Sequence, residues 1–174
     1  MARTKGTVRD IRLIGDPVLR TATEPVTEFD EALARLVEDL FASMYAAEGA
    51  GLAANQIGVS LSVFVYDCAD EAGERHSGHV VNPRLVATGG ENADDYEGCL
   101  SIPGLHYENP RPQWAAVEGV DQTGAPVRVE GDGTLGRCLQ HETDHLRGKL
   151  FVDLLRGRTK RHAFRDILAA DWSN

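Results

Sequence analysis

The chain has 174 residues, of which 42% are hydrophobic and 26% charged, with a formal net charge of −9. This size and mix predict one globular domain, 1–174, and exclude a chain dominated by low-complexity disorder. The acidic balance argues against DNA binding, because phosphate contacts need clustered Lys and Arg, and no apolar run approaches the roughly 18 residues of a membrane helix.

The first strongly periodic segment predicts an amphipathic helix over residues 27–48, because its apolar residues recur at i, i+3, i+4 and i+7. Thr27 is the expected N-cap and Gly49 the expected end. Residues 61–67 and 80–87 have the Val-rich composition of strands. Pro83 interrupts the second strand, which predicts an edge or an irregularity there.

The second half of the chain adds a hairpin and two helices. Strand-like residues 114–120 and 126–129 flank the turn signal Gln122-Thr123-Gly124. Helices are expected over 135–146, ended by Gly148, and over 159–170. Because these strands and helices do not alternate regularly, the pattern favours an α+β fold.

The 135–146 helix carries Gln140-His141-Glu142-Thr143-Asp144-His145. Helical residues four apart are rotated by about 40° and separated by about 6 Å, so both imidazoles can reach one metal ion. Glu142 lies about 100° around from His141, near enough to act on a water at that ion. On its own, the pattern also fits a helix with two ordinary polar histidines.

A catalytic metal site needs a third protein ligand. Cys138 and His145 are about 10.5 Å apart along the helix, too far for both to bind one ion through bonds of about 2.0 to 2.3 Å. We therefore interpret Cys138 as a small buried residue beneath the site and expect the ligand on another segment. Cys99, beside Gly98, is a candidate, although its surroundings also fit an ordinary loop.

A further segment, Gly49-Ala50-Gly51-Leu52-Ala53-Ala54-Asn55-Gln56, is rich in small residues and ends in an amide. Its glycines permit close backbone approach, and Gln56 could donate a hydrogen bond to a developing oxyanion. The same residues also fit a helix end followed by small packing residues.

Taken together, these segments resemble the peptide deformylase family. That family carries Gly-x-Gly-Leu-Ala-Ala-x-Gln, Glu-Gly-Cys-Leu-Ser and Gln-His-Glu-x-Asp-His, all intact here and in this order. Residues 15–20, 82–83 and 148–151 also look like family features. The resemblance implies mostly antiparallel strands packed around a central helix that carries the His-Glu-x-x-His motif, with an N-terminal amphipathic helix and a C-terminal helix.

The resemblance also implies an activity, the removal of the N-terminal formyl group from formyl-methionine of new polypeptides, with release of formate. One divalent ion would be held by Cys99, His141 and His145. Fe2+ is implied as the native ion, with Zn2+, Ni2+ or Co2+ as substitutes. A metal-bound water would attack the formyl carbon with Glu142 as general base and acid. Gln56 and the backbone N–H of Leu100 would hold the oxyanion.

The residues around this centre receive roles from the same resemblance. Four residues would contact the N-formylmethionyl peptide: Gly49, Gly51, Arg111 and Cys138. Glu97 and Asp144 would orient ligands or anchor the helix. The basic run 156–165 stands out in an acidic protein. Since deformylases act on chains emerging from the ribosome, this run either docks on ribosomal RNA or forms a solvated helix face.

Two alternatives stay open on the sequence alone. The helix motif also fits a zincin-type metallopeptidase, which would need neither Cys99 nor Gln56. A structural zinc module would be closed by four protein ligands, and Glu142 beside the ligands argues against it. The cysteine count is odd, and residues 1–10 are not followed by an apolar run, so we expect reduced thiols and a cytoplasmic protein.

Overall fold

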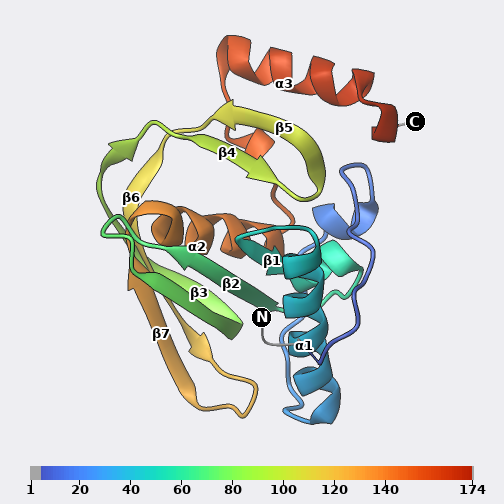
Figure 1. Ribbon diagram of the computed structural model, residues 1–174, viewed down its shortest axis with the longest axis vertical. Helices are drawn as coiled ribbons and strands as arrows, with labels where there is room; N and C mark the ends of the chain where they lie inside the picture. Colours follow the sequence, from blue (N-terminus) through green and yellow to red (C-terminus); the bar gives the residue numbers. More distant parts are fainter. Residues whose placement is uncertain (1–4, 174) are drawn as a thin grey trace.

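A five-stranded antiparallel sheet forms the base of the fold, which the computed structural model describes for residues 5–173 (Figure 1). Its strands lie in the order β1 (Gly51–Ala53), β2 (Val63–Ala69), β3 (Arg75–Ala93), β6 (Arg111–Val120) and β7 (Pro126–Gly131). A separate antiparallel hairpin consists of β4 (Tyr96–Cys99) and β5 (Ile102–Glu108). The α-helices are α1 (Glu31–Ala46), α2 (Gly133–Leu146) and α3 (Gly157–Ala169). The expected α+β fold is confirmed.

Short 3-10 turns join these elements: η1 (Pro17–Arg20), η2 (Ala54–Ile57), η3 (Phe151–Asp153) and η4 (Asp171–Ser173). In residues 5–173, no helix has both the length and the apolar character that crossing a bilayer requires.

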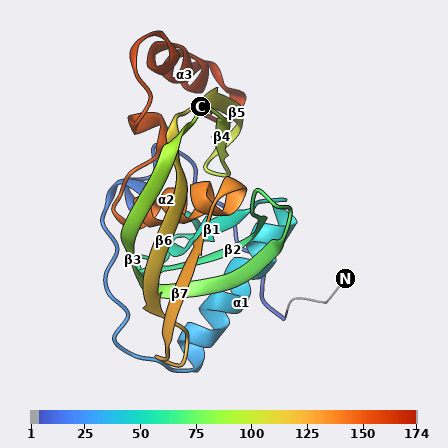
Figure 2. The same cartoon turned by 90° about the vertical axis from the view of Figure 1, so that its left-hand side faces the viewer.

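Helix α2 lies between the large sheet and the β4–β5 hairpin, and α3 covers the outer side of that hairpin (Figures 1 and 2). Because it is enclosed on both sides, most of α2 is buried, including Gln140, His141, Glu142 and His145. Burying polar groups costs free energy unless they find partners. A central helix with this sequence therefore needs hydrogen-bonding partners from the layers around it.

Helix α1 packs its apolar stripe against β1 and β2, as the periodicity predicts. The predicted N-cap is wrong, because the helix begins at Glu31 and the Asp30 side chain accepts a hydrogen bond from the Leu33 N–H. The preceding chain is held elsewhere, since the side chain of Asn82 bonds both the N–H and the carbonyl of Val26. A distant residue thus keeps the segment before Asp30 out of the helix.

The end of α1 also differs from the prediction in detail. The helix stops at Ala46, and Glu48 takes the left-handed conformation with a φ of 55°. The Gly49 N–H then donates to the Met44 carbonyl, which completes a Schellman-type end. Gly49 therefore follows the left-handed residue. Its missing side chain leaves room for Leu100, whose Cδ1 would lie 2.6 Å from an added Cβ.

The predicted strands all lie in the large sheet, and the predicted hairpin is formed by β6 and β7. Strand β3 is longer than expected, and its pairing with β6 shifts register between Val81 and Arg84, around Pro83. The predicted irregularity is confirmed. Gly148, with a φ of 73°, follows the end of α2 as expected. The strand character of β1 and of the β4–β5 hairpin was not predicted.

The observed start of α1 predicts unequal effects at two neighbouring positions. Asp30→Ala should lower the free energy of unfolding by about 1 kcal/mol, because the cap of the Leu33 N–H is lost. Thr27→Ala should change it by less than about 0.5 kcal/mol, because Thr27 is exposed and precedes the helix. Urea unfolding of both variants at one metal concentration measures the difference. A larger loss for Thr27→Ala would contradict the assigned N-cap.

Candidate metal centre and active site

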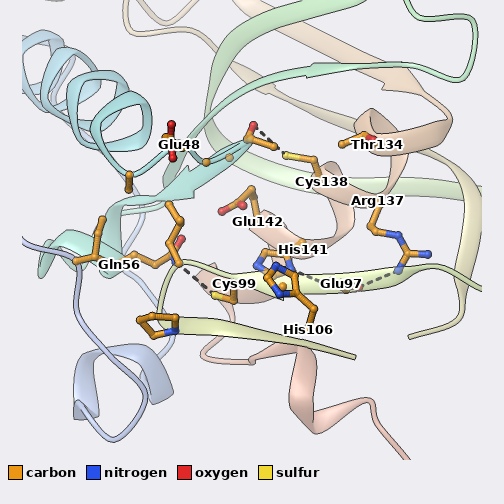
Figure 3. Close-up of a pocket in the computed structure, with 18 of the residues that line it drawn as sticks. Glu48, Gln56, Glu97, Cys99, His106, Thr134, Arg137, Cys138, His141 and Glu142 are labelled. Carbon is orange, nitrogen blue, oxygen red and sulfur yellow. Dashed lines mark hydrogen bonds and ion pairs between the residues drawn. The ribbon is translucent and has the colours of Figure 1, made fainter. Parts of the chain in front are cut away.

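A cleft of about 720 Å³ opens beside α2, with β1 on one side and β4 on the other (Figure 3). Nine of the predicted site residues line it: Gly49, Gly51, Gln56, Glu97, Cys99, Leu100, Cys138, His141 and Glu142. Three do not: His145 lies deeper, next to Cys99, whereas Arg111 and Asp144 lie at a second cavity. The fold thus gathers residues from three distant segments around one opening.

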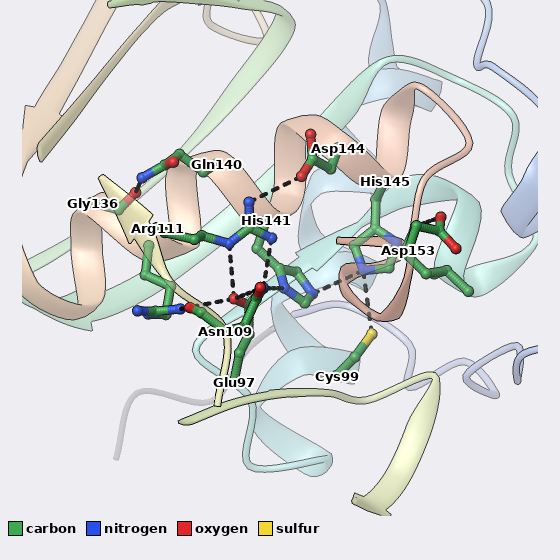
Figure 4. Close-up of polar contacts among 12 residues, drawn as sticks. Glu97, Cys99, Asn109, Arg111, Gly136, Gln140, His141, Asp144, His145 and Asp153 are labelled. Carbon is green, nitrogen blue, oxygen red and sulfur yellow. Dashed lines mark hydrogen bonds and ion pairs between the residues drawn. The ribbon is translucent and has the colours of Figure 1, made fainter. Parts of the chain in front are cut away.

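The ligand atoms of Cys99, His141 and His145 converge on one point (Figure 4). Sγ of Cys99 lies 3.3 Å from Nε2 of His145, which lies 3.0 Å from Nε2 of His141. Two nitrogens bound to one tetrahedral ion would be about 3.3 Å apart, given bonds of about 2.0 to 2.1 Å. The three side chains therefore fit a Cys-His-His metal site. Cys138 is not part of this group, as the helix geometry predicts.

The two histidines are prepared as ligands by different means. Burial, together with the neighbouring His141, lowers the pKa of His145 well below its usual value, which favours the neutral form that binds metals. For His141, Nδ1 lies 2.6 Å from the Glu97 carboxylate. A proton held on Nδ1 by this carboxylate leaves Nε2 free to face the ligand cluster.

Glu97 is buried, and its carboxylate is enclosed by hydrogen-bond donors. Oε1 accepts from His141 and from Nη2 of Arg111 at 2.7 Å, and Oε2 accepts from Nε of Arg111 at 2.8 Å. Nδ2 of Asn109 and Nη1 of Arg137 each donate to Oε2 at 2.9 Å. Burial alone raises the pKa of Glu97, but the hydrogen bonds from Arg111 and His141 outweigh it and hold that pKa well below its usual range.

Glu142 differs from Glu97, because its buried carboxylate lacks a surrounding set of hydrogen-bond donors. Its Oε2 has no hydrogen-bond partner among the described residues. Burial raises the pKa of Glu142 to about 7. A carboxyl group that titrates near neutrality and has an uncommitted oxygen beside a metal site can take up and release a proton.

The β1 side of the cleft consists largely of backbone, because the chain passes very close to α2 at Gly51. A Cβ added at Gly51 would lie 2.6 Å from Oε1 of Glu142 and 2.7 Å from Sγ of Cys138. The Cys138 thiol in turn lies 3.7 Å from the Ala50 carbonyl. Glycine is therefore required at position 51 for β1 to approach the helix.

The model of the family described as Polypeptide deformylase matches residues 8–161, which is most of the chain. The chain belongs to the peptide deformylase family. Membership confirms the expected enzyme class, a metallo-hydrolase that removes N-formyl groups, and it agrees with the Cys-His-His site found here.

Individual relatives agree with this placement. The chain is 54% identical over 167 residues to peptide deformylase 2 of Streptomyces coelicolor, covering 96% of this chain and 93% of that protein. The crystal structure of a peptide deformylase from Legionella pneumophila matches with a TM-score of 0.82 at 42% identity, covering 91% and 92% of the two chains. The Ehrlichia chaffeensis peptide deformylase solved with actinonin matches with a TM-score of 0.85 at 34% identity, covering 95% and 98%.

Arg111 occupies a different place from the one predicted for it. Its side chain is buried between Glu97 and Asp144, with Nη1 donating to Asp144 at 3.1 Å (Figure 4). It does not line the cleft, so its position does not fit a contact with the peptide. Glu97 contacts His141, and Asp144 contacts Arg111, while their orienting and anchoring roles stay a prediction. Sequence reasoning missed Asn109 and Arg137, although Arg137 lies one turn before His141 on the same helix.

The tight approach of β1 to α2 predicts a large effect of one methyl group in this deformylase. Gly51→Ala should lower kcat/KM by about 100-fold, because the added Cβ displaces either Glu142 or the β1 wall by a sizeable fraction of an ångström. The matched control is Gly89→Ala in β3, where the nearest atom to an added Cβ, in Trp114, is at 3.5 Å. Equal kcat/KM values for Gly51→Ala and Gly89→Ala would contradict the prediction and show that β1 can shift to accommodate a methyl group.

Proposed function

We propose that this member of the family hydrolyses the formamide of N-formylmethionyl peptides, with Glu142 as general base and acid. The observation that carries the proposal is the position of Glu142. Its carboxylate is buried, has a free oxygen, and lies in the cleft next to His141. A proton-transfer group in that place suits hydrolysis better than a closed structural metal site does.

We assign the metal to Cys99, His141 and His145, and we propose Fe2+ as the native ion, with Zn2+, Ni2+ or Co2+ as substitutes. One thiolate and two imidazoles are donors that all four ions accept. When bound, the ion supplies Lewis acidity, which acidifies a water molecule and polarises a carbonyl. The protein residues then have to move the proton, hold the developing charge and place the peptide.

Glu142 would accept a proton as a water oxygen adds to the formyl carbon. It would then return that proton to the peptide nitrogen as the bond between carbon and nitrogen breaks. Formate and a free N-terminal amine leave, and the carboxylate is regenerated. Its raised pKa, about 7, suits both halves of this exchange near neutral pH.

Gln56 and the backbone N–H of Leu100 are the proposed oxyanion donors. The Gln56 amide is held in one orientation, since Oε1 accepts from the Ala53 N–H at 3.0 Å and Nε2 donates to Ser101 Oγ at 3.1 Å. Its remaining N–H makes only a long contact of 3.6 Å with Cys99 Sγ. An oxyanion would replace that contact, and a donor of this kind is worth about 2.7 to 4 kcal/mol.

The peptide would lie along β1, which is an edge strand of the large sheet. An extended peptide can add to such an edge through main-chain hydrogen bonds. Gly49 and Gly51 keep this edge open, and Cys138 lies beside it. We now assign Arg111 to holding Glu97, in place of the peptide contact first expected.

Formate release tests the reaction and the base together. Anaerobically purified enzyme should release formate from a short formyl-methionyl peptide. Glu142→Ala and the isosteric Glu142→Gln should both lose about 10² to 10⁴ in kcat while retaining the metal. Unchanged turnover in either variant would remove Glu142 from the mechanism. Cleavage of internal bonds in an unformylated peptide, without formate, would favour a metallopeptidase.

We also propose that the chain acts in the cytoplasm as one domain, 1–174, and docks on ribosomes through the basic segment 156–165. Three arginines of this segment are exposed on α3, which lies outside the hairpin: Arg158, Arg161 and Arg165 (Figure 1). Arg165 lies 3.5 Å from Asp166, whereas Arg158 and Arg161 have no ion-pair partner among the described residues. Free cations of this kind suit a phosphate surface.

Cosedimentation tests the docking. The parent enzyme should pellet with ribosomes at low salt and be released as salt rises, and Arg158→Glu/Arg161→Glu should not pellet. The matched control reverses two exposed charges elsewhere, Arg35→Glu/Arg84→Glu. Segment 156–165 is not the docking surface if the parent stays in solution at low salt. The same follows if the control variant pellets as poorly as Arg158→Glu/Arg161→Glu.

A further inference from the structure

Arg137 lies on α2 one turn before His141, and its guanidinium contacts the hairpin side of the cleft (Figure 3). Nη1 donates to Glu97 Oε2 at 2.9 Å and to the Asn109 carbonyl at 2.6 Å. Nη2 donates to the Ala93 carbonyl at 3.0 Å. With only 14% of the side chain exposed, these bonds form where water competes little.

The two carbonyls mark the two ends of one structural unit. Ala93 ends β3 just before the β4–β5 hairpin begins, and Asn109 follows immediately after β5. The Asn109 N–H also donates to the Asp95 carbonyl, which closes the base of the hairpin. One guanidinium therefore ties both ends of the hairpin to α2. The hairpin carries Cys99, and α2 carries the two histidines.

The charge of Arg137 completes a balanced buried group. Glu97 and Asp144 contribute two negative charges, and Arg111 pairs with both of them. Arg137 supplies the second positive charge, on the Glu97 oxygen opposite the one that faces His141. Removing one partner from such a group leaves an uncompensated buried charge. Without Arg137, Oε2 of Glu97 would keep only Arg111 and Asn109 as donors, which would hold the carboxylate less firmly in its place beside His141.

We infer that Arg137 is a positioning residue of the metal centre, acting through Glu97 on His141 and through the hairpin ends on Cys99. Although Arg137 borders the cleft, both N–H groups of Nη1 and one N–H of Nη2 are used for the carboxylate and the two carbonyls. Through these three hydrogen bonds it holds the two parts of the site together. This inference rests on the proposed ligand roles of Cys99 and His141.

Metal retention tests the inference without relying on activity. Co2+-loaded Arg137→Met should transfer its metal to a chelator about 10 to 100 times faster than the parent, the range typical of lost outer-shell partners. Arg137→Lys should lie between them, because an ammonium keeps the charge but cannot span the carboxylate and both carbonyls. The visible Co2+ spectrum should shift in Arg137→Met, and kcat should fall more than KM rises.

The matched control is Arg128→Met, which removes an exposed arginine that also pairs with two carboxylates, Glu118 and Glu130. It should keep the metal and activity of the parent. Thermal unfolding of each apo variant identifies any that fail to fold, and Arg137→Lys then carries the comparison. A folded Arg137→Met with the parent's rate of metal loss would overturn the inference. So would a variant that changes only KM.

A double variant tests the route through Glu97. If Arg137 acts through that carboxylate, Arg137→Met should speed metal loss less in a Glu97→Gln background than in the parent. Equal factors in both backgrounds would overturn this route. These outcomes are separate from the proposed function, because a parent that holds its metal but releases no formate contradicts only the latter.

Discussion

The burial of the Glu97 carboxylate is the constraint on which the site depends. A charged group removed from water is tolerated only when donors surround it, and here the donors come from β6, from α2 and from the residue after β5. Bringing these donors together fixes how the hairpin lies over the helix. The same carboxylate sets which nitrogen of His141 carries a proton. The Glu97 carboxylate therefore contributes both to the packing of the hairpin on α2 and to the orientation of His141.

The polar character of α2 follows from this arrangement. A helix enclosed by a sheet and a hairpin would ordinarily be apolar on all sides. Here the partners of its polar groups are assigned one by one, with Gln140 bonding the Pro112 carbonyl and His145 facing Cys99. Two buried polar atoms of α2 have no partner in residues 5–173, Oε2 of Glu142 and Nδ1 of His145. Of these two residues, His145 belongs to the Cys-His-His cluster, and Glu142 is the carboxylate suited to proton transfer.

Local pattern was enough to predict the helices, four strands and the placement of His141 and His145 on one face, because these depend on spacing within a single segment. It failed where a distant residue decides the outcome. Asn82 holds the chain before α1 at Val26, a contact that residues 25–30 alone do not reveal. Arg137 and Glu97 are 40 residues apart, so an arginine that looks solvated in sequence proves to be enclosed. The sequence marks Arg111 as a basic residue near the site, but its partners Glu97 and Asp144 lie 14 and 33 residues away along the chain.

The β4–β5 hairpin was missed for a related reason. Its register shifts between Gly98 and Cys99, and Gly104 takes a φ of 76° next to Pro103. Neither feature gives the simple alternation from which strands are recognised. The need for a third ligand and the neighbouring Gly98 make Cys99 a candidate, and the match of its neighbours to a family pattern adds the stronger support. In the structure, Cys99 lies at the register shift of the hairpin, and its thiol faces His145.

The wall of the cleft formed by residues 49–51 bears on which peptides the site can accept. Gly49, Ala50 and Gly51 present mainly main chain to the cleft, and close packing prevents Gly51 from gaining a side chain. A surface of this kind recognises what all polypeptides share, their peptide groups, and ignores what distinguishes them. With the peptide proposed to lie along β1, such a surface would accept N-formylated chains that differ in sequence. The glycine that lets β1 approach α2 would thus also leave the cleft tolerant of different side chains along the peptide.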